Sequence, residues 1–147
     1  MSVCTQMDIF TSMTLKHAKH NEKACKHLND NGEFKDWIIT TAFYSAIHYV
    51  DHNLFPNQYE DPSTKKIKHF KSLDFYFTHT DRTKPKHEVR HDLVDEHLPE
   101  VSDDFQTLKE NCWNARYNDY NFDKEVSDLC VKCLGNIKDL CDDIPKV

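Results

Sequence analysis

The sequence contains little glycine and no long apolar run. Only two of its 147 residues are glycines, Gly32 and Gly135. Sheet proteins use glycine in hairpins and bulges, so this scarcity favours helices. No apolar stretch approaches the roughly 20 residues that cross a bilayer, and the N-terminus lacks the basic start of an export signal. We therefore expect a soluble cytoplasmic protein with no membrane partner.

Several enzyme classes lack their sequence signatures. Neither glycine has a second glycine nearby, so there is no glycine-rich loop to hold a phosphate, as ATPases and dinucleotide-binding enzymes require. No serine stands in the context of a nucleophile elbow. We accordingly expect no cofactor.

Metal binding and disulfides have little support in the sequence. The sequence has six cysteines but no export signal that would take them to an oxidising compartment, and a core of this size needs no disulfides. We therefore expect the cysteines to be free thiols. Cys130 and Cys133 have the spacing of zinc ligands, but no second pair completes a four-ligand set, and we expect both side chains on one helix. We expect no metal.

Two histidine pairs keep a metal alternative open. Each pair has the i, i+4 spacing that places both imidazoles on one helical face: His48 with His52, and His87 with His91. The pair His48 and His52 has no glutamate after its first histidine, whereas His87, Glu88 and His91 stand in the order of a His-Glu-x-x-His motif. A metal-binding helical-bundle enzyme is therefore the third of our hypotheses.

Charge is distributed unevenly along the chain. The net charge is −6, yet residues 64–91 carry eight Lys and Arg against three Asp and Glu. The segment 92–147 is acidic, with six Lys and Arg against fourteen Asp and Glu. The basic segment is explained either by a solvated helix face or by an anion-binding surface.

Apolar periodicity predicts an all-α single domain over residues 1–147. We expect four main helices over 11–30, 34–53, 102–117 and 123–141, with shorter helices over 64–77 and 86–97. In the segment 102–117 an inward-facing stripe is expected, since four residues recur at i, i+3, i+7 and i+8: Phe105, Leu108, Cys112 and Trp113. Short loops between such helices favour an up-and-down antiparallel bundle.

Three segments together resemble a known family. They are Ala-Phe-Tyr-Ser-Ala-Ile-His-Tyr-Val at 42–50, His-Glu-Val-Arg at 87–90, and Ala-Arg-Tyr at 115–117 followed by Asp-Tyr at 119–120. This order resembles HEPN-domain proteins, helical-bundle proteins of prokaryotic toxin–antitoxin, defence and nucleotide-handling systems. The resemblance implies a HEPN-like bundle that forms a homodimer.

The resemblance also implies a catalytic pair. Active HEPN members carry an arginine, usually a polar residue after it, and a histidine after four to six intervening residues, and they cleave RNA without metal at a site made by two protomers. Arg90 and His97 match the widest spacing, and Arg82 and His87 match the shortest, with Pro85 between them. The segment around Arg116 and Tyr117 has no histidine, as in non-catalytic branches of the family.

Our first hypothesis is binding of RNA or a nucleotide, with weak or absent ribonuclease activity at Arg90 and His97. Cations and the free N–H groups of a helix start would converge there on a phosphate. The predicted ligand-binding residues are His87, Arg82, Lys84, Lys86, Arg116 and Tyr117. A salt bridge is the alternative role for both Arg90 and Arg116. The second hypothesis is a non-catalytic interaction module that dimerises or docks on a partner protein from the same operon.

Overall fold

The computed structural model is 76% helical, with six helices packed against one another and one small two-stranded hairpin. It describes residues 3–80, 83–118 and 121–144, and side chains from residue 13 onward. The prediction of a helical protein with no more than a small hairpin is confirmed for these residues. Among them, no helix is long and apolar enough to cross a membrane.

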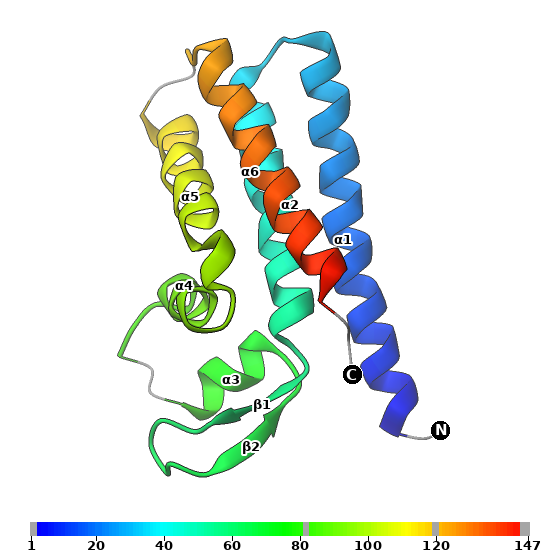
Figure 1. Ribbon diagram of the computed structural model, residues 1–147, viewed down its shortest axis with the longest axis vertical. Helices are drawn as coiled ribbons and strands as arrows, with labels where there is room; N and C mark the ends of the chain where they lie inside the picture. Colours follow the sequence, from blue (N-terminus) through cyan, green and yellow to red (C-terminus); the bar gives the residue numbers. More distant parts are fainter. Residues whose placement is uncertain (1–2, 81–82, 119–120, 145–147) are drawn as a thin grey trace.

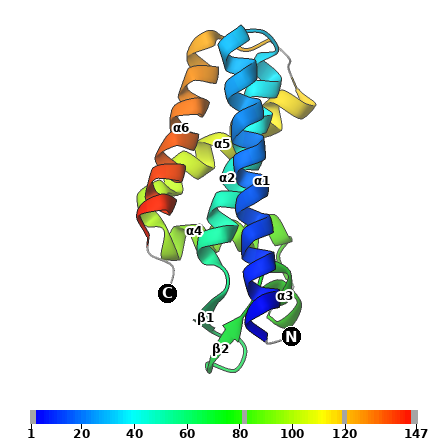
Figure 2. The ribbon, with the colours of Figure 1, turned by 90° about the vertical axis from the view of Figure 1, so that its right-hand side faces the viewer.

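The four long helices run along the long axis of the molecule (Figures 1 and 2). They are α1 (Val3–Asn31), α2 (Lys35–Leu54), α5 (Ser102–Tyr117) and α6 (Lys124–Asp143). The loop after α1 contains Gly32, whose φ of 72° lies in the left-handed region and whose N–H donates to the carbonyl of Leu28 at 3.0 Å. This confirms the predicted end of the first helix, which begins eight residues earlier than expected.

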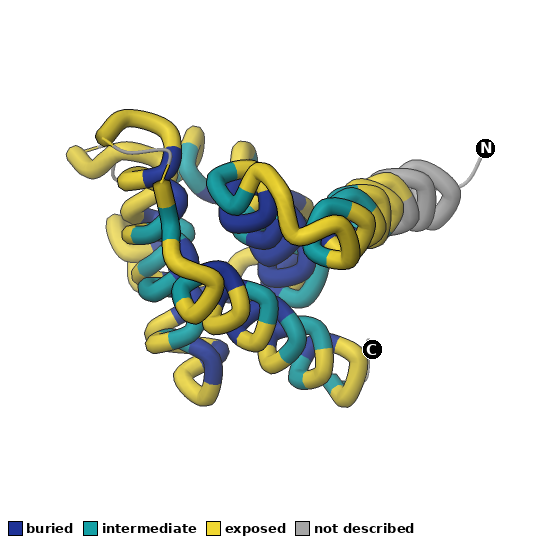
Figure 3. Tube along the Cα trace, turned by 90° about the horizontal axis from the view of Figure 1, so that it is seen from above, coloured by how far each residue is buried: buried dark blue, intermediate teal, exposed yellow. Residues whose placement is uncertain are grey.

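Helix α2 forms the centre of the core because it packs against α1, α5, α6 and α4 (Lys86–His97). Its small residues Ala42, Ser45 and Ala46 are fully buried and allow neighbouring helices to approach closely. Buried positions face the interior of the bundle in Figure 3, and exposed positions face outward. The core also receives large side chains from α5 and α6, including Phe105, Leu108 and Ile137.

The short elements gather at one end of the bundle (Figure 1). Strands β1 (Asn57–Glu60) and β2 (Ile67–Phe70) pair antiparallel, with Asn57 opposite Phe70. They are followed by α3 (Leu73–His79), and a 3-10 turn, η1 (Pro99–Val101), joins α4 to α5.

The predicted helix over 64–77 is therefore wrong in its first half. Ile67, Phe70 and Leu73 have helical spacing, but Ile67 is 65% exposed on the strand while Phe70 is buried. The helix begins only after Ser72, whose Oγ accepts the Phe75 N–H at 3.1 Å. This serine is the N-cap signal within the segment, and it marks where the helix starts.

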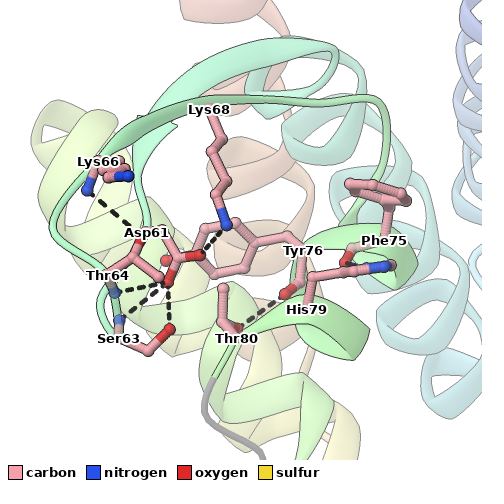
Figure 4. Close-up of polar contacts among 9 residues, drawn as sticks. All are labelled: Asp61, Ser63, Thr64, Lys66, Lys68, Phe75, Tyr76, His79 and Thr80. Atoms are coloured by element: carbon pink, nitrogen blue, oxygen red, sulfur yellow. Dashed lines mark hydrogen bonds and ion pairs between the residues drawn. The ribbon is translucent and has the colours of Figure 1, made fainter.

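A buried carboxylate closes the hairpin (Figure 4). Asp61, 1% exposed, accepts hydrogen bonds from the Lys68 ammonium at 2.8 Å and from the Ser63 N–H at 2.9 Å and hydroxyl at 2.6 Å. These contacts, led by the one with Lys68, hold the pKa of Asp61 well below its usual range. The turn therefore depends on Asp61 being ionised.

The described cysteines are buried free thiols. Cys130 and Cys133 both lie on α6, as predicted. Burial raises the pKa of each to about 12. These thiols are therefore protonated at neutral pH, which suits small core side chains.

Candidate ligand-binding groove

A groove of about 590 Å³ lies between α2, α4 and α5, and it is lined by four of the residues predicted from the sequence. They are His87 and Arg90 from α4 and Arg116 and Tyr117 from α5. The volume falls within the range of small-ligand sites. The walls are largely aromatic and aliphatic, with contributions from Phe43, Tyr44, Ile47, Phe105, Cys112 and Trp113, and the remaining lining residues are Lys109, Glu110 and Asn114.

Helix α5 presents cations and aromatic rings on the same side. Lys109, Trp113, Arg116 and Tyr117 stand at i, i+4, i+7 and i+8, which places them within an arc of about 100°. Trp113 is 63% exposed and Tyr117 is 65% exposed, and their ring centroids lie 4.6 Å apart. Trp113 therefore lies at the groove surface and not in the core, contrary to the inward stripe expected from spacing.

Arg116 bridges α5 and α2 at this groove. Its guanidinium carbon lies 5.7 Å from the centroid of the Tyr44 ring, and Nη1 donates to the Tyr44 hydroxyl oxygen. Within the described residues, neither Arg116 nor Lys109 forms an ion pair with a carboxylate. Their positive charge at the groove is therefore not neutralised by an ion pair in the part of the chain that the structure describes.

Arg90 has a different environment. Its Nε and Nη2 donate to the two carboxylate oxygens of Asp51 on α2, at 2.8 and 3.0 Å. The two side chains are only 14% and 20% exposed. This bidentate pair joins α4 to α2. It is a salt bridge, which is the alternative role that the sequence analysis gave for Arg90.

A smaller cavity of about 230 Å³ lies on the other side of the Arg90–Asp51 pair. Its lining includes His17 and His48, whose ring centroids are 5.2 Å apart. Burial is the main cause that lowers the pKa of His48, which favours the neutral ring at pH 7. No group of three His, Cys, Asp or Glu among the described residues is arranged to hold a metal ion.

Two other predicted ligand-binding residues, Lys84 and Lys86, do not line the groove. Lys84 pairs with Asp92 at 2.7 Å, and Lys86 pairs with Asp74 and lines the smaller cavity. Arg82 lies outside the described residues.

The structure does not bring Arg90 and His97 together within one chain. They stand seven residues apart on α4, which corresponds to about 10.5 Å along the helix axis. The ring of His97 packs against Tyr59 of β1, with centroids 4.6 Å apart, whereas Arg90 contacts α2. Any chemistry that uses both side chains therefore needs groups from elsewhere.

Sequence reasoning missed Lys109, Trp113 and Asp51. A signal for the first two is present: a lysine, a tryptophan, an arginine and a tyrosine repeat at helical spacing on one side of 102–117. Asp51 gave no signal, because it is 39 residues from Arg90 and only the fold brings them together.

Comparison with known proteins gives no relatives. No family model matches the chain, and neither a curated protein nor a solved structure matches it.

Proposed function

We propose that this chain is a HEPN-like, up-and-down helical bundle that binds RNA or a nucleotide in the groove between α2, α4 and α5. One observation carries the proposal: Lys109 and Arg116, two cations that pair with no carboxylate among the described residues, stand beside the exposed rings of Trp113 and Tyr117. An arginine supplies planar, charge-assisted hydrogen bonds to a phosphate. An exposed aromatic ring supplies a surface on which a base stacks.

Two further features support a phosphate-bearing ligand. His87 lines the groove from the first turn of α4, and a ring N–H of a histidine can donate a hydrogen bond to a phosphate oxygen. Arg116 is held in place by Tyr44, so less side-chain freedom is lost when a ligand binds.

Ribonuclease activity is a subordinate part of the proposal. Because Arg90 and His97 contact different elements within one chain, cleavage would require the composite site of a homodimer. Incubating the protein with RNA, with and without a chelator, tests this part. Cleavage that survives chelation supports it, and intact RNA leaves a binding protein.

The binding itself is tested through Trp113. In a Trp37→Phe background Trp113 is the only tryptophan, and its exposure makes its fluorescence sensitive to a stacked base. We expect quenching on titration with 5′-AMP or an RNA oligonucleotide, and roughly 5- to 150-fold weaker binding in Arg116→Ala. Lys132→Ala is the control, since it removes one exposed positive charge on α6, outside the groove. Equal affinity in Arg116→Ala and Lys132→Ala would contradict the proposal.

The second candidate is an interaction module, and the exposed aromatic side chains favour it. Phe34 and Trp37 are 63% and 56% exposed, in addition to the two rings on α5. Exposed aromatic side chains of this kind are enriched at protein interfaces. A homodimer, or a complex with a partner protein from the same operon, would cover them. Sedimentation at micromolar concentration tests the homodimer, and a monomer would contradict it.

A further inference from the structure

We infer that the ligand of the groove is a single strand of nucleic acid at least two nucleotides long, held by the alternating cations and rings of α5. The inference rests on the proposed function and names the ligand class for the same site. It distinguishes a strand from a free mononucleotide and from a duplex.

The separation of the two cations points to more than one phosphate. Lys109 and Arg116 are seven residues apart on α5, about 10.5 Å along the helix axis. The guanidinium of Arg116 is held at Tyr44, so it does not turn toward Lys109. A monophosphate at Arg116 therefore leaves Lys109 without an anion, whereas a second phosphate of the same strand supplies one.

The rings point to unpaired bases. Trp113 lies between the two cations in sequence and Tyr117 follows Arg116, and about two thirds of each residue is exposed. Bases in a duplex are stacked on one another and cannot cover these rings, but the bases of a single strand can. Glu110 is the acidic residue of the groove, and its carboxylate accepts from the Gln106 amide.

Stacking and phosphate contacts use groups that RNA and DNA share, so both strands are tested. The probes are an RNA tetranucleotide, the DNA tetranucleotide of the same sequence, a 12-base-pair duplex and 5′-AMP. Tetranucleotide and duplex binding are measured by the anisotropy of an attached fluorophore, and 5′-AMP binding by Trp113 fluorescence in the Trp37→Phe background. We expect at least one tetranucleotide to bind tenfold or more tightly than both 5′-AMP and the duplex.

Lys109→Ala is the decisive variant. It should weaken tetranucleotide binding by a clearly larger factor than 5′-AMP binding, because only the strand is long enough to reach both cations at once. With two phosphates neutralised, the logarithm of affinity should fall with the logarithm of salt concentration at a slope of about −1.4, and Lys109→Ala should reduce the slope to about −0.7. Lys132→Ala leaves the groove unaltered, so it should change neither the affinity for the tetranucleotide nor the slope. Melting curves of both variants verify that they are folded.

Four results would overturn the inference. If 5′-AMP binds as tightly as the tetranucleotides, or if Lys109→Ala weakens both equally, the groove binds one nucleotide; the proposed function then stands and the strand does not. If the duplex binds as tightly as the strands, stacking on unpaired bases is wrong. If none of the probes binds, the proposed function falls together with the inference.

Discussion

Replacing Arg90 with alanine removes one half of the ion pair that joins α4 to α2. Asp51 would keep its position, 20% exposed, without the two hydrogen bonds that now satisfy it. Breaking a fully buried pair costs about 3–5 kcal/mol, and breaking an exposed pair costs less than about 1 kcal/mol. Since both side chains are mostly but not fully buried, we expect about 2–3 kcal/mol. For a chain of this size the melting temperature should fall by about 4–12 °C.

A double-mutant cycle separates the pair from its surroundings. Arg90→Ala, Asp51→Ala and the double variant are unfolded with urea and followed by far-ultraviolet circular dichroism. If the two side chains stabilise the protein mainly through each other, the double variant loses clearly less stability than the sum of the single variants. The control is Lys84→Ala, which breaks an exposed ion pair with Asp92, a residue of the same helix as Arg90. This variant should lose less than about 1 kcal/mol of stability.

Ligand affinity measured on the same variants tests whether Arg90 also acts in binding. Its Nε and Nη2 are already occupied by Asp51, so we expect Arg90→Ala to change tetranucleotide affinity by no more than twofold at a temperature where the variant is folded. An unchanged melting temperature would refute the structural role. A loss of affinity as large as that of Arg116→Ala would show that Arg90 contacts the phosphate.

Three further predictions concern stability and the thiols. Asp61→Asn should lower the melting temperature at pH 7. Because the pKa of Asp61 is lowered in the folded protein, the difference in melting temperature from wild type should shrink as pH falls below about 4. A difference that does not depend on pH would contradict this. Ser45→Ala should cost about 1 kcal/mol in urea unfolding, because the buried hydroxyl donates to the Ala18 carbonyl at 2.7 Å. The five described cysteines should react with a thiol reagent only after unfolding, since they are buried and burial raises the pKa of each thiol; rapid reaction of these thiols in the native state would be inconsistent with that burial.

The long helices could be predicted because their signals are local. Apolar spacing placed α2 and α5 close to their observed bounds, and Gly32 marked the end of α1. The hairpin was missed because a strand of four residues offers too few positions to distinguish a period of 2 from a period of 3.6. Its stabilising contact, from Lys68 to Asp61, joins two residues of a segment without a regular pattern.

The groove was only partly predictable. His87, Arg90, Arg116 and Tyr117 were named from the sequence, and the fold brings all four to one groove. Periodicity shows which residues share a helix face, but it does not show whether another helix covers that face. Trp113 has the spacing of a core residue, yet no element of the described chain buries it, and it is 63% exposed.

Net charge along the chain was a poor guide to where an anion would bind. Segment 64–91 has the excess of Lys and Arg, yet Lys65, Lys68, Lys84, Lys86 and Arg90 all pair with carboxylates from neighbouring positions or elements. Lys109 and Arg116, the groove cations that form no ion pair within the described part of the chain, come from the most acidic part of the sequence. Helical geometry explains part of this difference, because Asp103 and Asp104 lie in the first turn of α5, at least five residues before Lys109. Glu110 does line the groove, and its carboxylate accepts from the Gln106 amide. What attracts a phosphate is a cation that forms no ion pair with a carboxylate, and only the fold determines which cations those are.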